Sequence, residues 1–330
     1  MSQLKRVYFF CGQLGLMVSV RFFFQWNLKY ADSRSSTDEV LFDAWMVGLL
    51  FFGARIFDGV TDPIAGWLSD RWVRWGRERR ILLWFSFIIP AIGLVLIFLP
   101  SHAMPPSLRW TLHAAGMLIF FVGYTFYAIP YWSLTNDYSG DDHERRRILS
   151  TLLGAGLIIA TAVVFIVSPL LIGPFGFRVS ALVFAIPCAA LMVLPIFARP
   201  TRGAPRPAGD EGRRESLPKQ LWLALKHRRF LAVLLIFSGS QMAFTVITVA
   251  SPFIATKLLG GDVEDVATIT APFLGAAVPI FIVAPMLSRR FGWQRMVVVA
   301  SLALAVVYAG AGGLGEAWVG SAMTTAMILF

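Results

Sequence analysis

The sequence has few of the side chains on which soluble enzymes depend. It contains two cysteines and four histidines among 330 residues, and only 15% of its residues are charged. Cys11 and Cys188 both lie in apolar stretches, so we expect them to pack in the interior rather than form a disulfide framework or a thiolate metal site. The histidines are far apart and have neither metal-ligand nor acid–base spacing. A membrane-bound enzyme is therefore a minor alternative, and we expect no catalytic residue and no cofactor.

Apolar residues are what the sequence has in abundance. They make up 57% of the chain, with 28 phenylalanines and 11 tryptophans. A helix needs about 20 apolar residues to cross the hydrocarbon layer of a bilayer, and runs of that length recur throughout. The sequence therefore predicts an all-α polytopic membrane protein. The predicted spans are 8–30, 43–69, 81–99, 109–133, 149–173, 179–197, 230–256, 264–287 and 295–314, followed by a tenth that begins near Ala317.

The basic residues are distributed unevenly around these spans. The formal net charge is +10, which by itself would suit a nucleic-acid partner. With the N-terminus in the cytoplasm, however, 22 of the 29 lysines and arginines fall in cytoplasmic segments, which is the positive-inside pattern. We therefore expect an integral protein of the plasma (inner) membrane with a cytoplasmic N-terminus. We expect it to be a monomer in contact with the lipid bilayer and to have no nucleic-acid partner.

A polar segment divides the chain into two halves. Residues 199–229 are rich in proline, glycine and charge and cannot bury a core, so we expect a six-helix bundle in 1–198, a cytoplasmic loop in 199–229 and a second bundle in 230–330. The loops GWLSDRWVRWGRERR and MLSRRFGWQRM share a pattern that indicates an internal repeat. As a helix, residues 316–330 would extend about 22 Å, too short to cross a bilayer. We therefore expect the second half to be truncated in the tenth span, and a non-transporting fragment or a structural membrane protein stays an alternative.

Three charged residues interrupt the second span, in the stretch ARIFDGVTDPIAGWLSD. Arg55, Asp58 and Asp62 share one helical face because they are three and four residues apart. Two carboxylates at this spacing repel each other in a membrane unless a cation or proton lies with them. Thr61 adds a hydroxyl, and Pro63 leaves a backbone carbonyl one turn earlier without its donor. The turn thus offers several oxygens to a hard cation.

These charges have two interpretations. In the first, they form a site for a transported cation or proton, with no other bound metal. In the second, Arg55 neutralises one aspartate while the other hydrogen-bonds a neighbouring helix. We favour the first interpretation, because ionisable residues inside a membrane are usually functional and two acids outnumber one arginine.

Polar residues also follow one face of the first span. Gln13, Met17, Arg21 and Gln25 are each four residues apart. Arg21 lies near mid-depth, where a charge should face protein or a water-filled cavity. It either contacts an anionic group of a substrate or pairs with an aspartate of the second span. We assign Gln13 and Arg21 to substrate binding.

The fourth span contains polar and amphipathic groups beside a proline, in YTFYAIPYWSL. Tyr124, Thr125 and Trp132 flank Pro130, a helix breaker. Aromatic residues near the end of a span often form an interfacial belt. For Trp132, this explanation and a position in a cavity are equally good. Because Tyr124 and Thr125 lie deeper, we expect them to line a cavity.

Charged loops follow the second, fourth and eighth spans. Solvated charge is their usual explanation, but paired loops of this kind can also form ion-pair latches that open and close during alternating access. The residues that we assign to such gate loops are Asp70, Arg71, Arg77, Arg145 and Arg289.

Taken together, these stretches resemble the glycoside-pentoside-hexuronide:cation symporters of the major facilitator superfamily, the family of the melibiose carrier. The matching segments are ARIFDGVTDPIAGWLSD, YTFYAIPYWSL and DDHERRR, all in the first half. The resemblance implies a major facilitator fold of two six-helix halves. It also implies a transporter that couples a gradient of Na⁺, Li⁺ or H⁺ to the uptake of a small organic solute.

The resemblance further implies roles for individual residues. Two aspartates would bind the coupling cation with two hydroxyls beside them, and aromatic residues of the fourth span would line the sugar pocket. The positions are Asp58, Asp62, Thr61 and Thr125 for the cation, and Tyr124 and Trp132 for the sugar.

Three positions depart from the family pattern. Where the melibiose carrier has two acids and an arginine against the sugar, this chain has Met17, Ala128 and Leu153. A site built to hydrogen-bond sugar hydroxyls depends on its buried polar groups, and these replacements make the pocket more apolar. The family default is a sugar or glycoside, whereas the replacements favour a more apolar or anionic substrate, such as a lysolipid.

Overall fold

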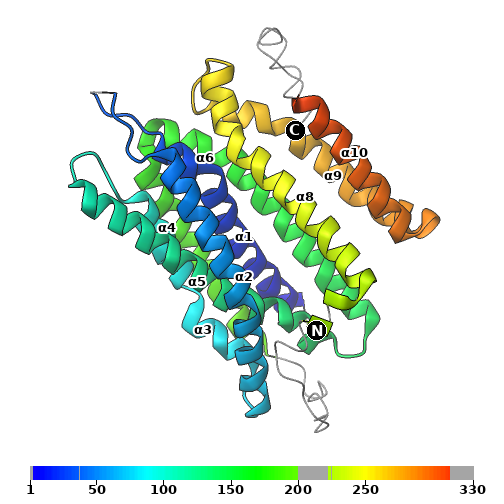
Figure 1. The fold of residues 1–330 in the computed structure, drawn as a ribbon. Helices are drawn as coiled ribbons and strands as arrows, with labels where there is room; N and C mark the ends of the chain where they lie inside the picture. The colour runs from blue at the N-terminus through cyan, green and yellow to red at the C-terminus, as the bar shows by residue number, and fades with distance from the viewer. Residues whose placement is uncertain (1–2, 37, 200–221, 224, 313–330) are drawn as a thin grey trace.

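The computed structural model describes residues 3–36, 38–199, 222–223, 225–312 and is helical throughout those ranges apart from short connections (Figure 1). In this part of the chain the β-structure is a single isolated bridge between Arg34 and Val40. The elements are α1 (Gln3–Ala31), α2 (Ala44–Arg74), η1 (Arg79–Ile81), α3 (Leu82–Ser86), α4 (Ile89–Phe98), α5 (Pro106–Ser139), α6 (His143–Val193), η2 (Leu194–Phe197), α8 (Arg228–Phe253), η3 (Ile254–Leu258, a π-helix), α9 (Asp265–Phe291) and α10 (Trp293–Gly312).

The predicted all-α membrane architecture is confirmed. Among the described residues, seven helices are long and apolar enough to cross a membrane. The predicted spans at 8–30, 43–69 and 109–133 correspond to α1, α2 and α5, and those at 230–256, 264–287 and 295–314 to α8, α9 and α10. The tenth span, and most of the central loop (200–221 and 224), lie outside the described residues.

The span predicted at 81–99 corresponds to Arg79–Phe98, which is one of the seven apolar spans, but its helix has a local break that the sequence did not predict. The chain forms η1, α3 and α4, with a break at Phe87 and Ile88. Pro90 explains the break, because it has no N–H to donate to the carbonyl of Ser86 and its ring clashes with that carbonyl in a continuous helix.

The two spans predicted at 149–173 and 179–197 are joined in the 51 residues of α6, and the second continues into η2. The backbone leaves helical geometry at Gly176, where φ is 72° and ψ is 173°. A positive φ is costly for residues with a Cβ atom, so glycine is suited to this position. α6 therefore consists of two helical segments, one on each side of Gly176.

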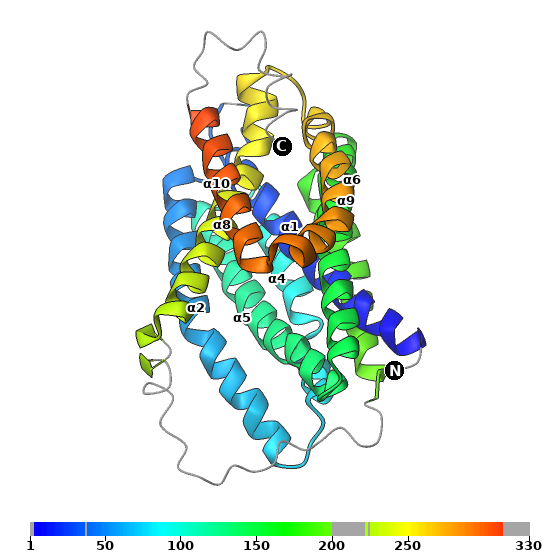
Figure 2. The same ribbon diagram turned by 90° about the vertical axis from the view of Figure 1, so that its right-hand side faces the viewer.

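α1 lies in the middle of the molecule. Figure 1 shows α1 and α6 between α2, α4 and α5 on one side and α8, α9 and α10 on the other, and Figure 2 views the same arrangement from the side of α9 and α10. Of the 29 residues of α1, 18 are buried. Trp26 donates from Nε1 to Ser168 Oγ of α6 at 2.7 Å, which fixes the rotation of α1 in the bundle.

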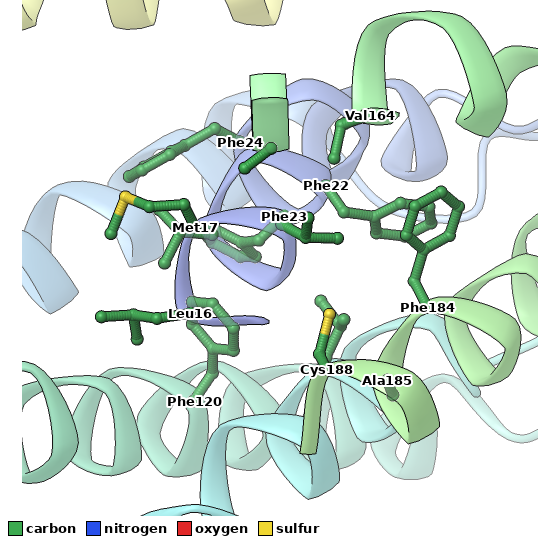
Figure 3. Packing of buried hydrophobic residues seen from close by; sticks show 14 of the residues in the cluster. Leu16, Met17, Phe22, Phe23, Phe24, Phe120, Val164, Phe184, Ala185 and Cys188 are labelled. Carbon is green, nitrogen blue, oxygen red and sulfur yellow. The ribbon is translucent and has the colours of Figure 1, made fainter. Parts of the chain in front are cut away.

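The core around α1 is largely aromatic. Phe22 and Phe23 point to opposite neighbours, toward Phe184 of α6 and Phe120 of α5, with ring centroids 4.8 and 4.9 Å apart (Figure 3). Cys188 is buried in this cluster and Cys11 is partly buried, and both are free thiols. Cys188 therefore packs in the core, as the apolar stretch around it predicts.

α4 and α5 approach each other closely through glycines. A Cβ atom at Gly93 would lie 2.4 Å from the backbone nitrogen of Phe120, and one at Gly123 would lie 2.7 Å from that of Pro90. Small residues at such contacts are typical of helix pairs in membranes. This packing fixes α5 immediately before Tyr124 and Thr125, which face the charged turn of α2.

Candidate functional site

The site is built on α2, whose other side chains are mostly exposed. Only four of its 31 residues are buried, and one of them is Asp58, at 6% exposure. Asp62 lies one turn further along and is partly buried. A carboxylate is rarely buried without a partner, so the contacts of Asp58 show what the position is built to do.

A single hydroxyl from α5 joins the two carboxylates. Thr125 Oγ1 lies 2.5 Å from Asp58 Oδ1 and 3.1 Å from Asp62 Oδ1. Thr125 is itself fully buried. The two aspartates therefore form one group, held against α5.

Arg55 supplies the positive charge of the group. Its Nη1 atom lies 3.1 Å from Asp58 Oδ2. The guanidinium also lies over the rings of Phe24, Phe51 and Phe121, at 4.7, 5.6 and 5.6 Å from their centroids. Cation–π contacts of this kind hold an arginine in one orientation. The Arg55 side chain is thus held in place by residues of α1 and α5 as well as by residues of its own helix.

Thr61 does not join this group in the structure. Its hydroxyl lies 3.0 Å from the carbonyl oxygen of Phe57 and 3.2 Å from that of Asp58, in the preceding turn of α2. Such bonds back to the helix are common for threonine. The hydroxyl that reaches the carboxylates is that of Thr125, and a role for Thr61 as a cation ligand stays a prediction.

Three of the four residues assigned to substrate binding are connected. Trp132 donates from Nε1 to Gln13 Oε1 at 3.0 Å, which links α5 to α1. The rings of Trp132 and Tyr124 are 6.3 Å apart in an edge-on arrangement. Gly156 of α6 packs against the Gln13 side chain, because a Cβ atom there would lie 2.7 Å from Gln13 Cγ. Trp132 thus lies in the helix interface and not in an interfacial belt.

Arg21 is the fourth residue, and it pairs with neither aspartate. Its guanidinium lies over the ring of Phe244 in α8, 4.3 Å from the centroid, and its side chain makes no ion pair with the described residues. The proposed pairing of Arg21 with Asp58 or Asp62 is therefore not seen, because Asp58 already pairs with Arg55.

Most of the residues assigned to gate loops lie on helices, which corrects the sequence analysis. Asp70 and Arg71 belong to the last turns of α2, Arg145 to the first turn of α6 and Arg289 to the last turn of α9, so Arg77 is the one that lies in a loop. Helices in membrane proteins often extend past the bilayer, and a charged helix end looks like a loop in a hydropathy pattern. Their contacts are local: Arg71 stacks on Trp67 and Trp75, Arg77 stacks on Trp72, and Arg145 pairs with Asp142 at 2.9 Å.

Arg79, which the sequence pattern does not single out, is bonded to several polar side chains at this end. It bonds to Ser69 Oγ at 2.6 Å, to Asp70 Oδ1 at 3.0 Å and to Asp137 Oδ2 at 3.0 Å. Arg79 belongs to the run RERR, and nothing in that run distinguishes Arg79 and Arg80, which turn inward, from Arg77, which is exposed.

Comparison with known proteins places the chain in a family. A model of the family described as "MFS/sugar transport protein" matches residues 12–330. The chain is 28% identical over 115 residues to the putative glycoside/cation symporter YagG of Escherichia coli, which covers 34% of this chain and 25% of that protein. It is 25% identical over 281 residues to the inner membrane symporter YicJ of the same organism, covering 81% of this chain and 60% of that protein.

A third relative comes from an animal. The chain is 31% identical over 133 residues to the sphingosine-1-phosphate transporter MFSD2B of Mus musculus, covering 36% of this chain and 26% of that protein. The aligned regions thus span between 25% and 60% of the length of these three relatives. The family match extends over nearly the whole chain and agrees with its apolar helices and with the resemblance to glycoside/cation symporters. The chain therefore belongs to the MFS/sugar transport protein family and is an integral membrane protein.

Proposed function

We propose that the protein is a secondary symporter, which couples the movement of Na⁺ or H⁺ to that of a small organic solute. The names of its bacterial relatives support symport, and the family description supports a sugar or glycoside as the default solute. The positive-inside pattern supports a plasma-membrane protein with a cytoplasmic N-terminus. In this proposal Asp58, Asp62 and Thr125 bind the cation, while Gln13, Arg21, Tyr124 and Trp132 line the substrate site.

The shared hydroxyl of Thr125 carries the proposal. Ionised carboxylates only accept hydrogen bonds, and a threonine hydroxyl has one proton to donate. Yet Thr125 Oγ1 lies within hydrogen-bond distance of both Asp58 and Asp62. One hydroxyl proton can serve both carboxylates only in a weaker three-centre hydrogen bond, so a proton on a carboxyl group or a cation between the oxygens would strengthen the arrangement. Arg55 balances one of the two negative charges, which leaves a binding site for one further positive charge.

The substrate site is connected to this cation site through α5. Tyr124 precedes Thr125 in the chain, and its ring contacts that of Trp132, which is bonded to Gln13 of α1. Without the cation, repulsion between the carboxylates favours separation of α2 from Thr125. Cation binding favours the arrangement in which Tyr124 and Trp132 are in place, so cation and substrate bind with higher affinity together than apart.

The test measures the cation itself. Thermal unfolding of the purified protein is compared in NaCl and in choline chloride at equal ionic strength, and over a range of pH. A cation that binds the folded state at a hundred times its Kd stabilises it by about 2.7 kcal/mol. We expect Na⁺ or protons to stabilise the wild type, and we expect Asp58→Asn and Asp62→Asn to abolish that response.

Asp70→Asn is the matched control, because Asp70 lies on the same helix but is exposed and bonded to Arg79. It should retain the wild-type response. Thr125→Ser should retain it as well, since serine keeps the hydroxyl, whereas Thr125→Val should lose it. An unchanged response to Na⁺ and to pH in both aspartate variants would show that the cation assignment is wrong.

A further inference from the structure

Arg21 and Gln25 of α1 are buried and have polar atoms that lack partners among the described residues. Arg21 is 8% exposed and Gln25 is fully buried. In the part of the chain that the structure describes, Arg21 Nε and both amide atoms of Gln25 have no hydrogen-bond partner. The two residues are four apart and so share one face of α1. Burying a guanidinium nitrogen and a whole amide without hydrogen-bond partners costs folding free energy. A ligand that binds beside Arg21 and Gln25 can supply the missing hydrogen bonds.

Neighbouring polar residues on the same face of α1 do have hydrogen-bond partners, so the missing bonds on this face are confined to Arg21 and Gln25. One turn further along, Lys29 donates to Thr256 Oγ1 at 2.8 Å and lies 3.9 Å from Asp32 Oδ2. In the other direction, Gln13 accepts from Trp132. The face of α1 therefore has satisfied polar groups at both ends and unsatisfied ones between them, at Arg21 and Gln25.

The surroundings of Arg21 are apolar. Its guanidinium lies over Phe244, and the ring of Phe244 is stacked with that of Phe165 in α6, 6.4 Å between centroids and 7° between planes. Met17 is buried one turn before Arg21 on the same face of α1. Neither aspartate of the α2 site pairs with Arg21, because Asp58 is bonded to Arg55 and Thr125, and Asp62 is bonded to Thr125. The charge of Arg21 is therefore free to attract a ligand anion.

We propose that Arg21 and Gln25 form an anion-binding subsite between the two halves, and that the substrate is an organic anion with an apolar part. Arg21 bonds the charged oxygens, the Gln25 amide donates a further hydrogen bond, and the apolar part packs near Phe244 and Met17. The proposal rests on the proposed function in one respect, since it takes the ligand to be the transported solute.

Matched pairs of ligands test this inference in the full-length protein in lipid nanodiscs. The first pair is 4-nitrophenyl β-D-glucoside and 4-nitrophenyl β-D-glucuronide, which differ by a carboxylate. The second is 1-oleoylglycerol and 1-oleoyl lysophosphatidic acid, which differ by a phosphate. We expect the anionic member of one pair to bind at least about tenfold more tightly than its neutral partner, as a charged hydrogen bond implies. The pair that responds identifies a sugar acid or a lipid as the source of the anion.

Substitutions then assign the preference to the subsite. Arg21→Gln should weaken the anion about tenfold or more and leave the neutral partner within about twofold. Arg21→Lys should retain part of the preference, and Gln25→Leu should weaken the anion by a smaller factor. The control is Arg109→Gln on α5, which removes an arginine whose Nε is also unpartnered but which lies near Leu41, at the far end of the span.

Two results would overturn the inference. One is that neither anion binds more tightly than its neutral partner, which includes a failure of both to bind. The other is that Arg21→Gln weakens both members of a pair equally. The cation proposal fails separately: an anion preference that depends on Arg21 but not on Na⁺ or pH would support the subsite and contradict cation coupling.

Discussion

Two charged clusters at opposite ends of the bundle are built in different ways. The Arg79 cluster consists of Arg79 with Ser69, Asp70 and Asp137, and all four residues belong to η1, α2 and α5 of the first half. The Asp32 cluster joins the halves. In it, Asp32 follows α1 and lies 2.8 Å from Lys257 of η3.

Further contacts strengthen the Asp32 cluster. Lys29 bonds to Thr256, and Lys29 and Lys257 both lie 5.3 Å from the ring centroid of Phe253. The buried residues of α8, Thr248, Ser251 and Pro252, are near this end, whereas residues 228–239 of α8 are exposed. The structure therefore shows the halves tied together at the end predicted to be extracellular. At the other end, the described contacts of the Arg79 cluster all lie within the first half.

Loss of Arg79 should have the largest effect on stability. Arg79→Gln removes three bonds to a side chain that is 10% exposed and leaves Asp137 partly buried without its cation. We expect a cost of about 2 kcal/mol in the free energy of unfolding, measured by thermal or denaturant unfolding in detergent. Arg77→Gln is the matched control, because Arg77 is exposed and stacks on Trp72. A loss in Arg77→Gln as large as that in Arg79→Gln would contradict the special role of Arg79.

Loss of Asp32 should instead change the distance between the halves. Asp32→Asn leaves Lys29 and Lys257 facing each other without the carboxylate between them, so the tied arrangement loses its attraction. We expect the population of the tied arrangement to fall about five- to tenfold relative to a state in which the halves are separated. A change of this size is typical of the coupling free energies between sites in proteins. Pulsed electron paramagnetic resonance between spin labels at Ala103 and Asp262 measures this distance.

The control for this experiment is Asp38→Asn, which breaks an exposed pair with Arg34 within one turn of chain. It should leave the distance distribution unchanged. Arg79→Gln should leave it unchanged as well, since the Arg79 cluster does not reach the second half. A shift in the distance in Arg79→Gln, or its absence in Asp32→Asn, would contradict the comparison of the two clusters.

The sequence predicts charged features well where they interrupt an apolar run. Arg55, Asp58 and Asp62 stand out in α2 because their spacing alone places them on one face of a helix. The pairing of Asp32 with Lys257 is not predictable in this way, because it joins residues on opposite sides of the central loop and depends on how α1 packs against α8. Contacts between distant segments are set by packing, which local periodicity does not encode.

The break in the third span and the charged helix ends show which features hydropathy does not predict. Pro90 was a visible signal, yet hydropathy alone gives an unbroken run over 81–99. Asp70 and Arg145 read as loop residues because they are charged, although both are helical. Hydropathy detects where a chain leaves the bilayer, whereas backbone hydrogen bonds decide where a helix ends.

The smallest expected effect concerns a charge that belongs to neither cluster. Asp142 is the N-cap of α6 and accepts a hydrogen bond from the Arg145 backbone N–H at 3.0 Å, which lowers the pKa of its carboxyl group below the usual value. A lowered pKa in the folded state stabilises the protein above pH about 4, and this contribution is lost as the pH falls through the folded-state pKa. Thermal unfolding between pH 3 and pH 6 should therefore show a slightly steeper loss in the wild type than in Asp142→Asn, since asparagine caps a helix without titrating. The distance between the halves should not respond to this substitution, because Asp142 caps a helix of the first half alone.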